Sequence, residues 1–199
     1  MSHQDEGKRD TLPPDQRPIK SVLRWGKDHS GIGSSIPKKD LGKWELVING
    51  EVQNPTLLKW EEFLRLPKAA TVSDFHCVEG WSVLNCKWEG VKFEEIFKLV
   101  QPNDNATAVT FSCSDGYSTS LTIKELSEDD VILAYRLNGK DLEEGLGGPM
   151  RLINPSKYSY KSAMWINEIT FTKEKEKGYW EVKGYSDSAD IWKNGRYSF

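Results

Sequence analysis

The sequence predicts an α+β fold with mixed β-sheets and short helices inserted between the strands. Runs with strand character outnumber amphipathic helical segments. Two of the strand-like runs are followed by an Asn-Gly pair, which is typical of a hairpin turn. The helical segments do not alternate regularly with the strands, as they would in a doubly wound parallel sheet. The chain has 199 residues, of which 37% are hydrophobic, which suits one sizeable domain rather than two large ones.

The chain begins with two segments that lack a regular period. Residues 1–20 are polar and contain the proline-rich stretch TLPPDQRP, which predicts an extended N-terminal arm. Residues 21–39 are rich in glycine and predict a long loop, a feature that is usually functional or mobile in a compact domain. We therefore expect residues 21–199 to form a single domain behind the arm.

The first regular elements follow this loop. Residues 43–48 alternate around apolar side chains, and the Asn49-Gly50 pair after them predicts the first hairpin. Residues 57–66 and 93–100 carry apolar side chains at helical spacing, and a proline follows each segment closely. Both segments are therefore predicted to be amphipathic helices.

The remaining elements are predicted to be mainly strands. A second pair, Asn138-Gly139, predicts another hairpin, and the charged run at residues 173–177 predicts a solvated turn. The other strand-like runs are residues 71–75, 108–113, 119–123, 131–137, 150–153 and 165–171.

Charge and cysteine content exclude several classes of protein. The net charge is −3, so the whole chain lacks the basic character of a nucleic-acid-binding or membrane-surface protein. No apolar run is long enough to span a membrane, and the N-terminus lacks an apolar signal core, which predicts a cytoplasmic protein. Three cysteines cannot all pair, and they do not group with histidine at zinc spacing. Neither a disulfide scaffold nor a zinc enzyme is expected.

One cysteine has a position that could support chemistry. Cys77 follows a predicted strand in the stretch DFHCVEGWS and leads into a loop that contains glycine and tryptophan. A side chain at a strand end is held rigidly beside the loops that build pockets. The residues alone leave three interpretations open: a buried structural thiol, a reactive thiolate, or a ligand to a soft metal.

A second segment concentrates positive charge in an otherwise acidic chain. Its glycines allow close backbone approach, and its basic side chains suit an anionic, partly aromatic ligand. A surface turn with solvated lysines explains the same composition. No glycine-rich nucleotide motif is present, so a purine nucleotide is not indicated. The basic and aromatic residues of this segment are Arg151, Lys157, Tyr158, Tyr160, Lys161 and Trp165.

Three motifs occur in order along the chain: FHCVEGWS, FSCSDGYSTSL and GGPMRLINPSKYSYKSAMW. Together they resemble the molybdopterin-binding domain of the sulfite oxidase family. The similarity is greatest to the small single-domain members and to the bacterial reductases of methionine sulfoxide in proteins. It runs from about residue 12 to residue 197, and the closing stretch GYWEVKGYSDSADIW resembles the tail of the small members. The resemblance implies the sulfite-oxidase-type molybdopterin-binding fold.

The resemblance also implies a set of site residues. Cys77 would be the one protein ligand to molybdenum, or to tungsten in its place, and the pterin dithiolene would supply two more sulfurs. Relatives commonly have lysine where this chain has Met164, and Lys161 is a candidate to supply that missing positive charge. Relatives also commonly have asparagine or histidine where this chain has Leu146. The residues implied to contact the cofactor are Arg24, Trp25, His29, Ser112, Ser114, Arg151, Lys161, Ser162 and Ala163.

The family's chemistry is oxygen-atom transfer, with two electrons exchanged with a separate carrier protein. The resemblance implies catalytic roles for Cys77 and Arg24, and the carboxylate of Glu79 beside the cysteine makes it a third catalytic candidate. Sulfite oxidases have arginines just after the cysteine, whereas this chain has Glu79, which would repel sulfite by about 1 to 4 kcal/mol at ~4 Å. We therefore expect a small neutral S- or N-oxide as substrate. The net charge predicts no nucleic-acid partner, and we expect the protein to be a monomer.

Two alternatives to this function remain at the level of the sequence. One is a metal-free thiol redox protein that uses Cys77, with Cys86 as the resolving partner. The other is a module that binds the pterin without turnover.

Overall fold

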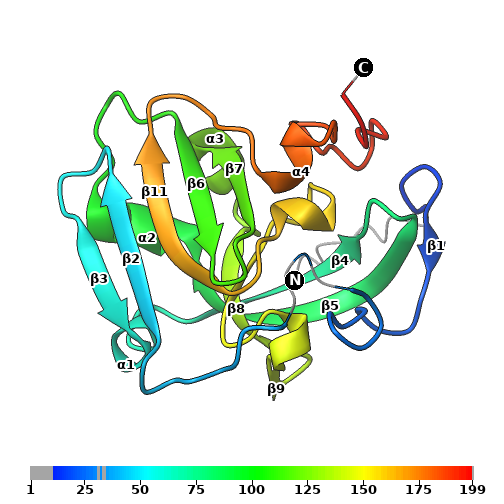
Figure 1. Ribbon diagram of the computed structural model, residues 1–199, viewed down its shortest axis with the longest axis horizontal. Helices are drawn as coiled ribbons and strands as arrows, with labels where there is room; N and C mark the ends of the chain where they lie inside the picture. The colour runs from blue at the N-terminus through cyan, green and yellow to red at the C-terminus, as the bar shows by residue number, and fades with distance from the viewer. Residues whose placement is uncertain (1–10, 31, 33–34, 199) are drawn as a thin grey trace, which may run out of the picture.

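The computed structural model describes residues 11–30, 32 and 35–198, and these residues form two β-sheets with few, short helices. This arrangement confirms the predicted α+β fold. One sheet has the strand order β3-β2-β11-β6-β7, in which β11 is parallel to β2 and antiparallel to β6 (Figure 1). Its strands are β2 (Glu45–Gly50), β3 (Thr56–Lys59), β6 (Ala108–Cys113), β7 (Ser118–Thr122) and β11 (Ile166–Thr172).

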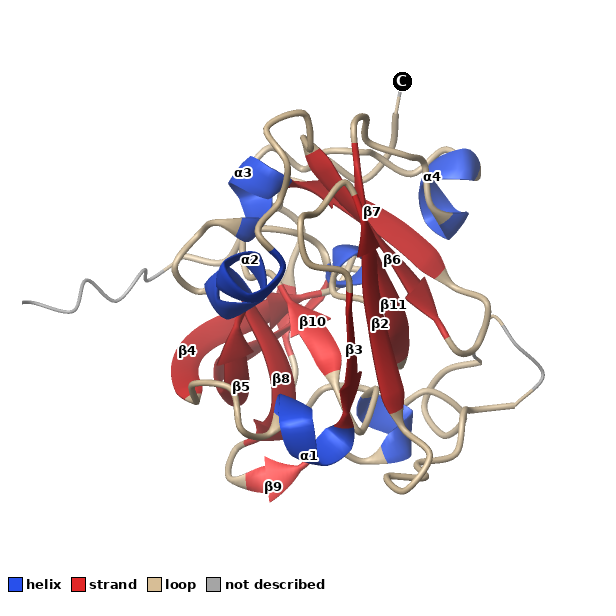
Figure 2. Cartoon of the chain, turned by 90° about the vertical axis from the view of Figure 1, so that its left-hand side faces the viewer, coloured by secondary structure: helices blue, strands red, loops and turns tan. Residues whose placement is uncertain are grey.

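The second sheet is built around β5, which is the longest strand and pairs with three others. Its main path is β1-β5-β8-β10, with β4 antiparallel to β5 and β9 antiparallel to β8. Figure 2 shows the strands of the two sheets as separate groups. The strands of this sheet are β1 (Arg17–Pro18), β4 (Ala69–His76), β5 (Trp81–Lys92), β8 (Ile132–Leu137), β9 (Lys140–Asp141) and β10 (Arg151–Ile153).

The helices are short, and one of them has a clear amphipathic pattern. Helix α2 (Phe93–Val100) coincides with its prediction and buries Phe93, Ile96 and Val100 on one face. The others are α1 (Trp60–Phe63), α3 (Ile123–Leu126), α4 (Tyr179–Val182) and the 3₁₀ turns η1 (Glu144–Leu146) and η2 (Ser159–Lys161). No helix in the described ranges has the length and apolar character that crossing a bilayer requires.

The main hydrophobic core joins the two sheets. Ile48 and Phe111 from the five-stranded sheet pack in one cluster with Val91 and Leu133 from the other sheet and with α2. A second cluster forms around β4 and β5 and includes Trp88 and Cys77. Because Cys77 belongs to this packed cluster, the main chain that carries its sulfur is held by the core.

Two predicted elements differ from the structure. Residues 57–59 lie in β3 because they pair with β2, so only Trp60–Phe63 of the predicted helix is helical. The predicted first hairpin is present, because β2 and β3 pair antiparallel, but residues 51–55 connect them and Asn49-Gly50 lies at the end of β2. Gly50 has φ +88°, and a Cβ there would lie 2.1 Å from the carbonyl oxygen of Phe171. Glycine at this position therefore serves the close pairing of β2 with β11, not a two-residue turn.

The second Asn-Gly prediction is confirmed, whereas strand β5 was not predicted at all. Asn138 and Gly139 connect β8 to β9 as an antiparallel hairpin. The sequence of β5 does not alternate cleanly, because its first residues are buried on both faces and a bulge interrupts its pairing at Glu89 and Gly90.

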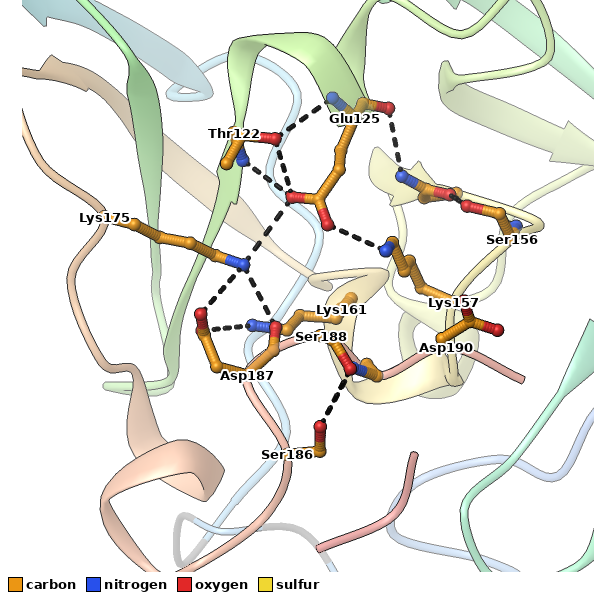
Figure 3. A network of polar contacts seen from close by, with 12 residues as sticks. Thr122, Glu125, Ser156, Lys157, Lys161, Lys175, Ser186, Asp187, Ser188 and Asp190 are labelled. Carbon is orange, nitrogen blue, oxygen red and sulfur yellow. Dashed lines mark hydrogen bonds and ion pairs between the residues drawn. The ribbon is translucent and has the colours of Figure 1, made fainter. Parts of the chain in front are cut away.

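The charged run at residues 173–177 is mostly exposed to solvent, as predicted, but Lys175 within it is partly buried and takes part in a polar network. Lys175 Nζ lies 3.6 Å from a carboxylate oxygen of Glu125 and 3.2 Å from one of Asp187 (Figure 3). Glu125 also accepts hydrogen bonds from the backbone and hydroxyl of Thr122 and from Lys157, whose Nζ is 2.7 Å away. Burial by itself would raise the pKa of Glu125, but these donors outweigh burial and lower its pKa to about 2.

This pKa predicts acid sensitivity of the fold. Glu125 has a lower pKa in the folded chain than its ordinary value of 4.5, so its carboxylate stabilises the fold above about pH 4.5. That contribution is lost as the pH falls toward about 2. In urea unfolding, the free-energy difference between wild type and Glu125→Gln should be largest at neutral pH and should shrink below pH 4.5. A difference that is the same at every pH would contradict this, and Glu61→Gln, at an exposed site, is the control.

Candidate functional site

A cleft opens beside the turn between β4 and β5, and it encloses about 930 Å³, counting the part open to solvent. Six separate parts of the chain line it. They are the glycine-rich loop, the β4–β5 turn with the strand ends beside it, the β6–β7 turn, Arg151 of β10, the segment of residues 159–165 and the C-terminal residues Trp180 and Tyr185. The cleft is therefore a product of the tertiary fold and not of one motif.

Cys77 lies in the tight turn between β4 and β5. Its N–H donates to the carbonyl of Trp81 at 2.8 Å, and its own carbonyl accepts from the N–H of Gly80 at 3.0 Å. The side chain lines the cleft, although the residue is only 9% exposed. Burial raises the pKa of the Cys77 thiol to about 11, so the free thiol is protonated at neutral pH. The turn offers one rigidly held sulfur to the cleft.

A cluster of polar and aromatic side chains surrounds this sulfur. Glu79 Oε2 lies 3.9 Å from Cys77 Sγ and accepts a hydrogen bond from Trp81 Nε1 at 3.1 Å. The same oxygen lies 3.1 Å from His29 Nε2, and the His29 ring packs against the ring of Trp25 with centroids 5.0 Å apart. The glycine-rich loop and the β4–β5 turn thus meet at the cleft.

Arg151 places a buried guanidinium in the wall of the cleft. Its two terminal nitrogens donate to the carbonyls of Leu146 and Ser162, each at 3.0 Å, and the group lies 4.9 Å from the centre of the Phe75 ring. Burial lowers the pKa of Arg151 to about 10, so it remains charged at neutral pH. Its Nε–H has no hydrogen-bond partner among the described residues, although it is buried. Because this donor lies in the wall of the cleft, it is available to an acceptor on a bound group.

Gly147 sets the shape of the chain just before Arg151. It has φ +93°, and a Cβ would lie 2.7 Å from Met164 Cγ and 3.3 Å from Arg151 Cβ. Only glycine combines this positive φ with so close an approach to Met164. The residue pair Gly148-Pro149 that follows has a cis peptide bond.

Most of the site residues predicted from the sequence line this cleft. The turn supplies two of them, the glycine-rich loop two more, and the strand and segment after residue 150 the rest. These residues are Trp25, His29, Cys77, Glu79, Arg151, Ser162 and Ala163.

Four predicted site residues do not line the cleft. Arg24 Nε is 2.7 Å from a carboxylate oxygen of Glu143, and Lys161 Nζ is buried against Glu181. Ser112 lies within β6, and the hydroxyl of Ser114 donates to the carbonyl of Trp165 at 3.2 Å. Their direct roles in cofactor binding stay predictions from the resemblance.

Several residues of the cleft were not predicted from the sequence. Asp115 and Tyr117 come from the turn between β6 and β7, and Trp180 and Tyr185 come from the C-terminal segment. Burial raises the pKa of Asp115. The closing stretch GYWEVKGYSDSADIW carried an aromatic signal, but its sequence does not indicate which part of the fold it contacts.

The donor set of the cleft restricts the kind of metal it could hold. No group of three or more His, Cys, Asp or Glu side chains in the described part of the chain could by itself bind a metal ion. A metal that takes only Cys77 from the protein must bring its other ligands with it. Molybdopterin supplies dithiolene sulfurs and hydrogen-bond acceptors, so it fits both this single sulfur and the spare donor of Arg151.

The fold and this cleft define the class of molybdopterin-dependent oxidoreductases. The chain belongs to the family described as the oxidoreductase molybdopterin-binding domain, which matches residues 33–180. Its cofactor is molybdenum with molybdopterin, as the sequence resemblance predicted.

Comparison with known proteins gives relatives of several kinds. The chain is 35% identical over 161 residues to the uncharacterized oxidoreductase YuiH of Bacillus subtilis, with 81% of each chain covered. It is 30% identical to the protein-methionine-sulfoxide reductase catalytic subunit MsrP of Campylobacter jejuni, with 69% of this chain and 52% of MsrP covered. The chain therefore spans about half the length of that reductase.

A solved structure supports the fold. The sulfane dehydrogenase SoxCD of Paracoccus pantotrophus superimposes with a TM-score of 0.67 at 20% identity, and the match covers 74% of this chain and 42% of the SoxCD chain. At this level of identity the similarity establishes the shared fold.

Proposed function

We propose that this oxidoreductase transfers an oxygen atom from a small neutral sulfoxide or N-oxide, using two electrons from a separate carrier protein. The observation that carries the choice of substrate is the charge of the cleft. Glu79 and Asp115 line it, and Arg151 is the one permanent cation among the described lining residues. Two nitrogens of that cation are already bonded to backbone carbonyls. A neutral oxide is therefore favoured over sulfite.

The chain's own residues have distinct tasks in this reaction. When bound, the molybdenum cofactor supplies the oxygen-atom transfer and the two-electron redox change. Cys77 would hold the metal, and Arg151 Nε would donate to the pterin. His29, whose Nε2 lies 3.1 Å from the carboxylate oxygen Oε2 of Glu79 at the cleft, is the group that could deliver protons to the oxygen removed from the substrate, with Glu79 orienting its ring.

The relatives support the sulfoxide as substrate. Two of them are named for the reduction of methionine sulfoxide in proteins, MsrP and the putative reductase subunit YedZ1 of Azospira oryzae, which is 33% identical over 151 residues. Both names include the word subunit, which agrees with an electron carrier on another chain. The cytoplasmic location stays a prediction, and the three cysteines are free thiols.

The thiol-only alternative lacks an activated sulfur. Burial raises the pKa of Cys77 to about 11 and the pKa of Cys86 to about 12, whereas reactive cysteines have lowered values. Metal analysis separates the remaining possibilities. Molybdenum near one per chain supports the enzyme, and pterin without metal supports the binding module.

The charge argument predicts the effect of removing the carboxylate beside Cys77. With reduced viologen as donor, the wild type should reduce neutral sulfoxides and should oxidise sulfite poorly with a dye acceptor. Glu79→Gln should raise kcat/KM for sulfite by about tenfold, because repulsion of about 1 to 4 kcal/mol is removed.

The control is Glu89→Gln, which removes a carboxylate on β5 that lies near Arg136 and does not line the cleft. It should leave the sulfite rate unchanged. Rapid oxidation of sulfite by the wild type, with no reduction of sulfoxides, would refute the proposed function.

A further inference from the structure

The C-terminal segment, residues 179–198, folds back onto the cleft. It begins with α4, which lies beside β7 and the turn η2 in Figure 1. Trp180 and Tyr185 from this segment line the cleft together with Tyr160 of η2. The match to the family domain ends at residue 180, so nearly all of this segment lies beyond it.

Buried ionic contacts hold the segment in place. Lys161 Nζ is fully buried and contacts a carboxylate oxygen of Glu181, the carbonyl of Ser120 at 3.1 Å and Asp187 Oδ1 at 3.4 Å. Asp187 also bonds to Lys175, as Figure 3 shows. Because Lys161 directly precedes the cleft residues Ser162 and Ala163, these contacts join the C-terminal segment to the cofactor side of the cleft.

Hydrogen bonds from η2 reinforce this attachment. The hydroxyl of Tyr160 donates to the carbonyl of Ser186 at 2.6 Å, and the N–H of Tyr158 donates to the carbonyl of Ala189 at 2.9 Å. Tyr158, Tyr160, Ala189 and one further residue, Ile191, form a small hydrophobic cluster. The position of the segment is therefore fixed by charge, hydrogen bonding and burial together.

The held segment forms an aromatic wall, defined here as Tyr160, Trp180 and Tyr185. The rings of Tyr160 and Tyr185 meet edge to face with centroids 5.6 Å apart, and those of Trp180 and Tyr185 are 5.0 Å apart. Val78, the residue after Cys77, packs against the same cluster. The wall thus begins next to the predicted metal ligand.

A wall of this kind suits one part of a sulfoxide. The oxygen of a sulfoxide is polar and must face the reacting centre, whereas its carbon substituents are apolar. Aromatic rings bind such substituents through burial of apolar surface and through contacts with sulfur. The three side chains of the wall carry no positive charge, and Lys161 Nζ, 5.9 Å from the centre of the Tyr160 ring, is already paired with Glu181 and Asp187.

We propose, on the basis of the function proposed above, that the aromatic wall selects sulfoxides with an apolar alkyl or aryl substituent. Trp180 and Tyr185 contact that substituent, and the ion cluster of Lys161, Glu181 and Asp187 positions them. The segment outside the matched family domain would therefore set the substrate preference of the cleft.

The test compares two neutral sulfoxides of different size, dimethyl sulfoxide and methyl phenyl sulfoxide. Trp180→Ala should raise the KM for methyl phenyl sulfoxide by at least about tenfold, with kcat changed less than about threefold, because the contact is to the bound substituent. The KM for dimethyl sulfoxide should change by less than about threefold. Tyr185→Leu should shift the same preference in the same direction.

Two further variants separate contact from position. Val182→Ala, on the same helix at a site that is 71% exposed, should change neither KM. Glu181→Gln should reproduce the KM shift of Trp180→Ala without removing a ring. Molybdenum content of each variant verifies that the cleft is intact.

A binding measurement keeps this inference distinct from the proposed function. Calorimetric titration of the oxidised holoenzyme with methyl phenyl sulfide, the reaction product, needs no turnover. Weaker binding to Trp180→Ala by about tenfold, with no change in Val182→Ala, supports the wall even if the wild type reduces no sulfoxide. Equal product binding by wild type, Trp180→Ala and Tyr185→Leu would overturn it, and so would KM changes of equal size for both sulfoxides.

Discussion

Replacing Cys77 by serine is expected to lower kcat by about 10³-fold or more, which corresponds to a loss of about 4 kcal/mol of transition-state stabilisation. Serine is close to cysteine in size, but its hydroxyl is a poor ligand for a metal that prefers thiolate. The turn that carries Cys77 is held by backbone hydrogen bonds to Trp81 and Gly80, which the substitution retains. The fold should therefore survive while turnover is lost.

The measurement is steady-state reduction of a sulfoxide together with molybdenum and pterin analysis of the purified variant. Cys86→Ser is the matched control, because Cys86 is 1% exposed and does not line the cleft. It should retain nearly full activity. If Cys77→Ser were as active as the wild type, the sulfur at position 77 could not be the metal ligand.

The second large effect is expected for Arg151→Leu. The substitution leaves the carbonyls of Leu146 and Ser162 buried without their donors, at about 1 to 3 kcal/mol each. The free energy of unfolding should therefore fall by about 2 to 6 kcal/mol, and the variant should retain little pterin because the Nε donor is also gone. Urea unfolding and pterin fluorescence measure the two losses separately.

Two other variants delimit this prediction. Arg151→Lys can restore one donor and should lie between wild type and Arg151→Leu in both measurements. Arg136→Leu removes an exposed arginine that pairs with Asp141 on the surface, and it should leave both the urea midpoint of unfolding and the pterin content close to those of the wild type. Wild-type stability and pterin content in Arg151→Leu would show that the guanidinium is dispensable.

Helices and strands were predicted with correct bounds where the local pattern of apolar residues was regular. Residues 93–100 and 108–113 were predicted with the bounds that the structure has, because their buried positions repeat at the helical and the strand period. Residues 57–59 began a segment with helical spacing but are strand, because β2 pairs with them. Strand β5 was missed because burial on both faces removed its alternation.

The residues of the cleft likewise divide into those that a local motif predicts and those that only tertiary contacts bring together. The sequence by itself determined the class of protein and predicted that Cys77 and Arg151 belong to the site. Each lies within a short motif of consecutive residues, which can be recognised without knowing the tertiary structure. Only the tertiary structure decided that Lys161 pairs with Glu181 and that Trp180 and Tyr185 line the cleft. These contacts depend on where the folded chain returns after β11. That position is set by the packing of whole sheets, which no local pattern encodes.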